Sequence, residues 1–275
     1  MRDLSRDLHW LAINTATVKS WSLEQVIEGC TRAGIGAIAP WRDIVQACGA
    51  ERAGRLIRAT ELTVTCLCRG GMFTAADAAG RQAALADNRR AVDEAAEIGA
   101  GSLVLVVGGL PPGSKDLAGA HRQVRDGMGE LLPYARAAGV PLALEPLHPM
   151  TAADRACVNT LAHANDLCDE LGEGVGIALD VYHVWWDHDL ARQVARAGKR
   201  IISYHVCDWL VPTRDLVFDR GMPGDGIIDL RHIRGLVEAA GYAGHCDVEV
   251  LSQNWWQRDP AEVLRICIDR HQTVV

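Results

Sequence analysis

Four side chains that can bind a metal ion each lie at the end of a short apolar run of the sequence. Glu145 ends VPLALE, Asp180 ends VGIALD, His205 lies in RIISYHV and Glu249 lies in DVEVLS. Short apolar runs bounded by turn signals are typical of strands buried on both faces. A carboxylate at the tip of such a strand is costly to bury unless a cation or hydrogen bonds satisfy it. The recurrence on four runs therefore predicts one shared site at the strand ends.

The composition of this set indicates which ion it would hold. Three carboxylates and one imidazole favour a hard or borderline divalent ion, with Mn²⁺ preferred and Mg²⁺ or Co²⁺ as alternatives. Without a cation among them, three close carboxylates would raise one another's pKa. The competing interpretation is four independent, solvated or hydrogen-bonded polar residues, which requires the same coincidence on every one of the four runs.

Side chains that could bind a substrate lie next to these positions. His148 follows Glu145 within a Pro-bounded loop, and His183 follows Asp180. Aromatic faces suit the C–H surfaces of a sugar or an attached ring, although each could instead serve core packing or a subunit contact. The aromatic candidates at predicted strand ends are Trp41, Phe73, Trp185, Trp186, Trp209, Trp255 and Trp256. The candidate hydrogen-bond donors are Arg42, Arg69 and Arg214, each of which could also be a solvated or ion-paired surface residue.

The elements that must position these residues alternate regularly between strand and helix. The predicted strands cover residues 8–16, 35–40, 62–68, 102–107, 140–145, 175–180, 200–206 and 246–251. The predicted helices cover residues 21–34, 44–60, 75–99, 116–138, 159–171, 189–197, 230–240 and 260–271. Eight such units predict a parallel sheet closed into a (β/α)₈ TIM barrel, whose chemistry lies at the C-terminal strand ends. An open doubly wound sheet is the alternative, but Asn14-Thr15-Ala16 lacks its Gly-rich phosphate loop.

Composition limits the remaining possibilities. No linker or composition shift divides residues 1–275, so a single domain is expected. The net charge of −7 does not indicate the positively charged surface that binds nucleic acid or an anionic membrane. No apolar stretch of the sequence is long enough to span a bilayer. The N-terminal residues lack the apolar region of a secretory signal, and nine cysteines form no C-x-x-C pair. We therefore expect a cytoplasmic protein with reduced, mostly buried thiols.

Several segments together resemble one known family. LALEPLHP, ALDVYHVWWD, YHVCDW, GMPGDGIIDL and GYAGHCDVEVLS occur in this order between residues 140 and 252. In this order they are similar to the xylose isomerase-like TIM barrel superfamily, in its sugar (phosphate) isomerase/epimerase branch. The resemblance implies that Glu145, Asp180, His205 and Glu249 are metal ligands. It also implies that the two glutamates move protons on opposite faces of the substrate, and that His183 contacts substrate.

The leading hypothesis is therefore a divalent-metal-dependent sugar isomerase or epimerase. A ketose or keto-sugar would react through a metal-stabilised enediolate, with Glu145 and Glu249 as acid and base. The main alternative is a lyase on the same site, either an inosose-type dehydratase or an enzyme that β-eliminates a 3-keto-glycoside, with His148 or His183 as the acid. A DNA-repair endonuclease or a non-catalytic sugar-binding protein fits less well. The expected partners are a small carbohydrate and further copies of the chain, as a dimer or tetramer.

Overall fold

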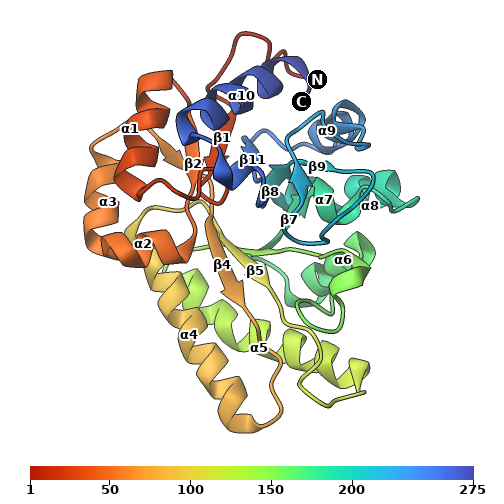
Figure 1. The fold of residues 1–275 in the computed structure, drawn as a ribbon. Helices are drawn as coiled ribbons and strands as arrows, with labels where there is room; N and C mark the ends of the chain where they lie inside the picture. The colour runs from red at the N-terminus through yellow and green to blue at the C-terminus, as the bar shows by residue number, and fades with distance from the viewer.

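The computed structural model describes all residues from Met1 to Val275. Nine parallel strands form one sheet, in the order β3-β2-β1-β11-β8-β7-β6-β5-β4 (Figure 1). Its strands are β1 (Leu11–Asn14), β2 (Ala37–Ala39), β3 (Thr63–Val64), β4 (Leu67–Gly71), β5 (Leu103–Val106), β6 (Leu142–Leu144), β7 (Val175–Asp180), β8 (Ile201–Val206) and β11 (Cys246–Val248). A separate antiparallel pair joins β9 (Asp208–Trp209) to β10 (Arg220–Gly221).

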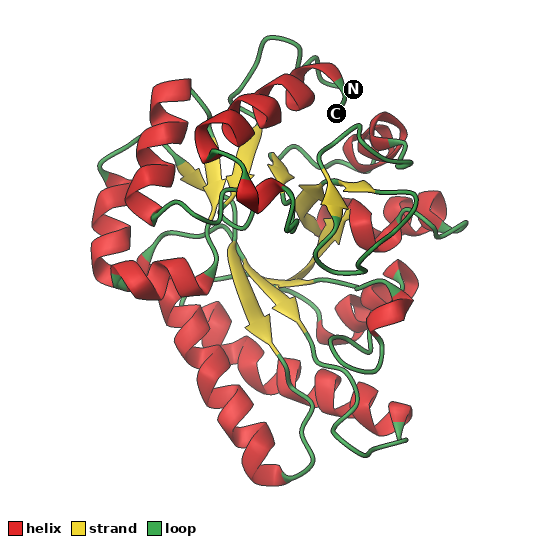
Figure 2. Ribbon diagram, in the orientation of Figure 1, coloured by secondary structure: helices red, strands yellow, loops and turns green.

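Helices surround this sheet on its outer side (Figure 2). They are α1 (Leu23–Ala33), α2 (Arg42–Cys48), α3 (Ala50–Arg58), α4 (Ala78–Glu97), α5 (Leu117–Ala137), α6 (Leu161–Leu171), α7 (Val181–Val184), α8 (Leu190–Ala197), α9 (Leu230–Ala239) and α10 (Pro260–Thr273). Local signals explain several of the boundaries. Ser22 caps α1 in a capping box with Gln25, and Gly34 ends it with a φ of 71° that suits glycine. None of the helices combines the length and apolarity that a membrane span requires.

The two ends of the sheet are formed by one continuous stretch of chain. β3 pairs with β2 and β4 pairs with β5, and only Thr65 and Cys66 separate β3 from β4. A further bridge joins Trp41, just after β2, to Cys68 in β4. The third predicted strand is therefore split between the two edges, and it closes the sheet almost completely. This arrangement has eight strand positions, which confirms the predicted (β/α)₈ barrel.

Other predicted elements also differ from those in the structure. The helix expected over 44–60 is broken at Gly49, whose φ of 85° and ψ of 122° are not helical, so α2 and α3 are separate. The strand expected over 246–251 ends at Val248, so Glu249 lies just beyond it. Residues 208–225, which lie between the predicted strand over 200–206 and the predicted helix over 230–240, contain the β9–β10 pair.

Alternation along the strands separates two packing environments. Large aliphatic residues such as Leu142, Leu144, Ile177 and Leu179 belong to the main core between sheet and helices. The intervening inward positions carry small side chains that form their own cluster inside the barrel: Ala39, Cys66, Cys68, Val104, Ala143 and Ala178. Since successive strand residues face opposite sides of a sheet, the residue two positions after each small one also faces the barrel axis.

Candidate active site

This alternation places the four predicted ligands on the inner face of the barrel. Glu145 lies two residues after Ala143, and Asp180 lies two residues after Ala178. Asp180 and His205 are also register partners across β7 and β8. Each of the four residues Glu145, Asp180, His205 and Glu249 is buried, and each offers one ligand atom within 4.8 Å of those of the other three. The structure thus brings together residues at the C-terminal ends of four different strands.

His205 presents one ring nitrogen to the carboxylates. Its Nδ1 lies 3.6 Å from Oε1 of Glu145 and 3.8 Å from Oε2 of Glu249, and it is buried without a hydrogen-bond partner. The other nitrogen, Nε2, lies 2.9 Å from Oγ of Ser203, which holds the ring in place. A buried, unpartnered imidazole nitrogen among carboxylates fits a divalent cation, since the cation would satisfy all four groups at once. The donor set also fits, because oxygen ligands with one imidazole suit hard or borderline ions.

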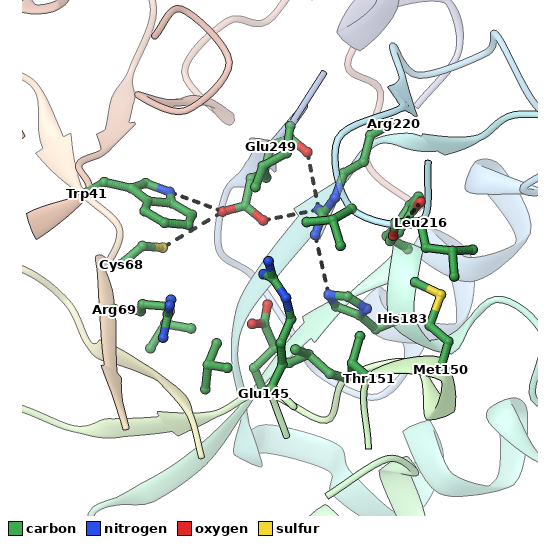
Figure 3. Close-up of a pocket in the computed structure, with 17 residues that line it drawn as sticks. Trp41, Cys68, Arg69, Glu145, Met150, Thr151, His183, Leu216, Arg220 and Glu249 are labelled. Atoms are coloured by element: carbon green, nitrogen blue, oxygen red, sulfur yellow. Dashed lines mark hydrogen bonds and ion pairs between the residues drawn. The ribbon is translucent and has the colours of Figure 1, made fainter. Parts of the chain in front are cut away.

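Glu249 receives hydrogen bonds on both of its carboxylate oxygens. Asn14 Nδ2 donates to Oε1 at 3.0 Å, and Trp41 Nε1 donates to the same oxygen at 3.3 Å. Arg220 Nη1 lies 3.1 Å from Oε2 (Figure 3). Burial raises the pKa of Glu249 to about 7, although Arg220 and His205 favour its ionised form. A carboxylate with a pKa in this range can both accept and return a proton near neutral pH.

Arg220 is a site residue that the sequence did not reveal. Its Nη1 contacts Asp180 as well as Glu249, its Nη2 lies 3.3 Å from Nε2 of His183, and its guanidinium stacks on the ring of Tyr182. Pairing of β10 with β9 carries it back from the loop to the barrel rim. Its position directly before the GMPGDG segment is the signal that could have found it.

The predicted Arg214, by contrast, does not line the cavity. Its side chain is 61% exposed, and it is ion-paired with Asp219, 2.6 Å away. Arg42, another candidate donor, forms ion pairs with Asp87 and Glu94 in the structure.

His183 is held as a neutral imidazole facing the site. Its ring lies between two donors, since the backbone N–H of His148 is 3.1 Å from Nδ1 and Nη2 of Arg220 is 3.3 Å from Nε2. Burial lowers the pKa of His183 to about 4, and Nε2 lies 3.7 Å from Oδ2 of Asp180. His183 therefore presents a neutral imidazole to the cavity near neutral pH.

The other predicted substrate residues divide into two groups. Trp41 and Arg69 line the cavity above the four ligands, beside Glu145, Glu249 and His183 (Figure 3). The remaining ones pack beside that cavity: the ring of His148 stacks on Trp209 with centroids 5.1 Å apart, and Trp185 lies 5.5 Å from the same Trp209. The wall is completed by apolar side chains that include Met150, Leu216 and Leu251.

Comparisons with known proteins agree with this architecture. Protein SMc04130 from Sinorhizobium meliloti 1021 has a solved structure with a TM-score of 0.96 and 57% identity, covering 98% of this chain and 99% of that one. IolI, solved with a zinc atom bound, has a TM-score of 0.81 and 20% identity, covering 94% of this chain and 95% of that one. The inosose isomerase of Halalkalibacterium halodurans is 27% identical over 154 residues, which cover 53% of this chain and 52% of that enzyme.

The match between the two chains therefore spans only about half the length of this curated relative. A profile of one family matches a much longer part of the chain, residues 25–267, and its description is a xylose isomerase-like TIM barrel. This match agrees with the closed parallel sheet and with the buried polar cluster at its strand ends. The chain belongs to the xylose isomerase-like TIM barrel family.

Proposed function

We propose that this protein is a divalent-metal-dependent isomerase or epimerase of a ketose or keto-sugar. The observation that carries the proposal is the buried cluster of Glu145, Asp180, His205 and Glu249, whose ligand atoms all lie within 4.8 Å of one another. Nδ1 of His205 lies within this cluster, buried and without a hydrogen bond, where a bound cation would satisfy it together with the three carboxylates. The partial relative, named an inosose isomerase, supports the same class of reaction.

The four clustered side chains would hold the metal. When bound there, a divalent ion supplies Lewis-acid polarisation of a substrate carbonyl and compensates negative charge that develops on the substrate. We propose Mn²⁺ as the native ion, because a carboxylate-rich set with one imidazole suits it, with Mg²⁺ and Co²⁺ as alternatives. IolI, which has a similar fold, was solved with a zinc atom bound, and this supports a divalent ion in the present protein as well.

The chain's own residues would move the proton. Glu249, with its pKa raised to about 7, would remove the proton from the carbon next to the carbonyl, and Glu145 would deliver one from another direction. Arg220 would donate hydrogen bonds to substrate oxygens, and the neutral imidazole of His183 would contact the substrate beside it, since both groups line the cavity. Return of the proton to the opposite face of the same carbon gives an epimer, and return to the neighbouring carbon gives an aldose–ketose exchange.

The positions of two histidines favour this chemistry over elimination. A lyase needs an acid beside the leaving group, and the sequence suggested His148 or His183 for that role. The ring of His148 packs on Trp209 and does not line the cavity. His183 does line it, but burial lowers its pKa to about 4, so it is neutral and a weak proton donor. We therefore place the lyase second.

Proton NMR in D₂O tests the proposal. The Mn²⁺-loaded protein and its chelated form would be incubated with ketohexoses, ketopentoses, inosose and 3-keto-glucosides. We expect deuterium uptake next to the carbonyl that chelation abolishes and that Glu249→Gln lowers by about 10³-fold. Glu51→Gln, on the exposed side of α3, is the matched control and keeps full exchange. Loss of water or of an aglycone would assign the protein to the lyases instead.

A further inference from the structure

A second cavity opens directly beside the proposed metal site. The two cavities share Trp41, Arg69, Arg155 and Leu251 in their walls. The first has a volume of only about 50 Å³, whereas the second has about 420 Å³. The first cavity therefore accommodates little more than the reacting carbons of a sugar, and the remainder of a substrate must extend into the second. The second cavity has a size that is typical of small-molecule sites.

The second cavity is positively charged, although the whole chain is negative. Its walls carry three cationic side chains, Lys19, Arg69 and Arg155, and one carboxylate, Asp43. The chain as a whole has a net charge of −7. A local excess of cations in an acidic protein concentrates anionic ligands at that place.

Arg69 and Arg155 lie on the wall common to both cavities, and each is only half exposed. Neither guanidinium makes an ion pair or a hydrogen bond within the protein, and no interaction line reaches Arg69 in Figure 3. The nearby Arg42 shows the usual arrangement, because it is paired with two carboxylates, Asp87 and Glu94. Burial and the positive charge of Arg155 lower the pKa of Arg69, and the charges of Glu145 and Glu249, which make no direct ion pair with it, only partly oppose this shift. These two neighbouring guanidinium groups therefore lack the directly bound carboxylate or phosphate that such groups normally pair with.

We propose that Arg69 and Arg155 bind an anionic group of the substrate, a phosphate or a carboxylate, while the keto end of the same molecule reaches the metal site. This inference rests on the proposed function and narrows its substrate class to phosphorylated or acidic keto-sugars. The aromatic side chains of the second cavity, which include Trp21, Phe218 and Trp256, would pack against the carbon skeleton between the two ends. Lys19, held 4.3 Å from the ring centroid of Trp256, adds a third positive charge at this wall.

Three ketohexoses that differ only at C6 test the inference: D-fructose, D-fructose 6-phosphate and D-fructuronate. Their binding to the full-length, Mn²⁺-loaded protein would be measured by calorimetry. We expect at least one charged sugar to bind about tenfold or more tightly than fructose. Arg69→Gln and Arg155→Gln should each weaken binding of the charged sugar far more than binding of fructose, so that most of this preference is lost. Arg55→Gln, which removes one exposed charge from α3, is the matched control and should keep the preference.

Charge-retaining variants separate loss of a ligand from loss of structure. Arg69→Lys and Arg155→Lys should keep part of the preference, with melting temperatures equal to those of the Gln variants. The tighter of the two charged sugars identifies the group as phosphate or carboxylate. The inference is overturned if neither charged sugar binds, if fructose binds as tightly as both, or if the preference survives in the double Gln variant.

Deuterium uptake in the same samples separates this inference from the proposed function. An arginine-dependent preference without any exchange would support the anion site and count against the isomerase proposal. Equal exchange with fructose and with both charged sugars would support the isomerase and overturn the anion site.

Discussion

Nη1 of Arg220 lies 2.8 Å from Oδ2 of Asp180, and both side chains are buried. Although burial opposes ionisation of Asp180, the charges of Arg220 and His183 lower its pKa below the usual value. The same Nη1 also contacts Oε2 of Glu249 at 3.1 Å. Arg220 therefore balances part of the negative charge in the cluster of carboxylates, and it competes there with any second cation.

This relationship predicts opposite effects of Arg220→Gln on metal binding and on stability. Removal of a competing positive charge should tighten Mn²⁺ binding by about tenfold, which corresponds to ~1.4 kcal/mol. The chelated variant should lose roughly 3 kcal/mol of unfolding free energy, because two buried carboxylates lose their partner. Calorimetric titration with Mn²⁺ and urea unfolding measure the two effects. Arg214→Gln, which breaks an exposed ion pair with Asp219, serves as the control, and weaker Mn²⁺ binding by the Arg220 variant would refute the argument.

Metal binding should itself stabilise the fold. With three carboxylates buried within 4.8 Å of one another, a cation that binds only the folded chain raises its stability by about 2.7 kcal/mol at a hundred times its dissociation constant. We expect the melting temperature of the chelated protein to rise by several degrees when Mn²⁺ is added. Glu145→Gln should abolish most of this rise, whereas Asp43→Asn, outside the cluster, should preserve it. An unchanged melting temperature in the wild type would argue against a metal at this cluster.

Much of the site could be predicted because alternation in a strand is a local property. The small inward residues Ala143 and Ala178 each precede a carboxylate by two positions, so strand assignment alone directs Glu145 and Asp180 to the barrel axis. The count of eight strand–helix units then predicts the barrel fold, and in such a barrel the C-terminal ends of the four strands lie close together.

The residues that sequence reasoning missed depend on the paths of loops. Arg220 reaches the site through the short β9–β10 pair, which lies within a stretch that reads as an irregular polar loop. The ring of His148 turns toward Trp209, although its position beside Glu145 suggested a substrate contact. Gly49 breaks the second predicted helix because its backbone is not helical, and a single glycine in the sequence does not by itself predict such a break. Each of these outcomes depends on tertiary packing, which residue spacing does not encode.

The two glutamates predict a directional pattern of proton exchange. If they act from different directions, Glu249→Gln should abolish deuterium uptake from one member of an epimer pair and leave slow uptake from the other, whereas Glu145→Gln should do the reverse. Each loss should be about 10²- to 10⁴-fold, the usual contribution of a positioned acid or base. Initial rates of exchange from each pure epimer, followed by proton NMR, measure the pattern. Equal loss from both epimers in both variants would indicate that one glutamate serves only as a ligand.

A buried histidine far from the site predicts how stability depends on pH. His271 on α10 is fully buried, its Nε2 lies 3.2 Å from the backbone carbonyl oxygen of Asp7, and its Nδ1 has no partner. Burial lowers its pKa from 6.5 to about 4, an effect that the nearby Arg234 and Arg2 reinforce. Below pH 6.5 the unfolded chain binds a proton that the folded chain does not, so the stability that His271 contributes is complete above this pH and falls as the pH drops toward 4.

Replacement of His271 by glutamine should therefore reduce the sensitivity to acid. Glutamine keeps an N–H donor for the carbonyl of Asp7 but does not titrate. Between pH 7 and pH 4.5 the wild type should lose about 2 to 3 kcal/mol more unfolding free energy than His271→Gln, as follows from the shift of the pKa. Urea unfolding at the two pH values measures the difference, and His188→Gln, whose side chain is 99% exposed, should behave as the wild type. Parallel losses in wild type and variant would show that this histidine is protonated in the folded chain, because only a folded-state pKa near 6.5 removes the difference.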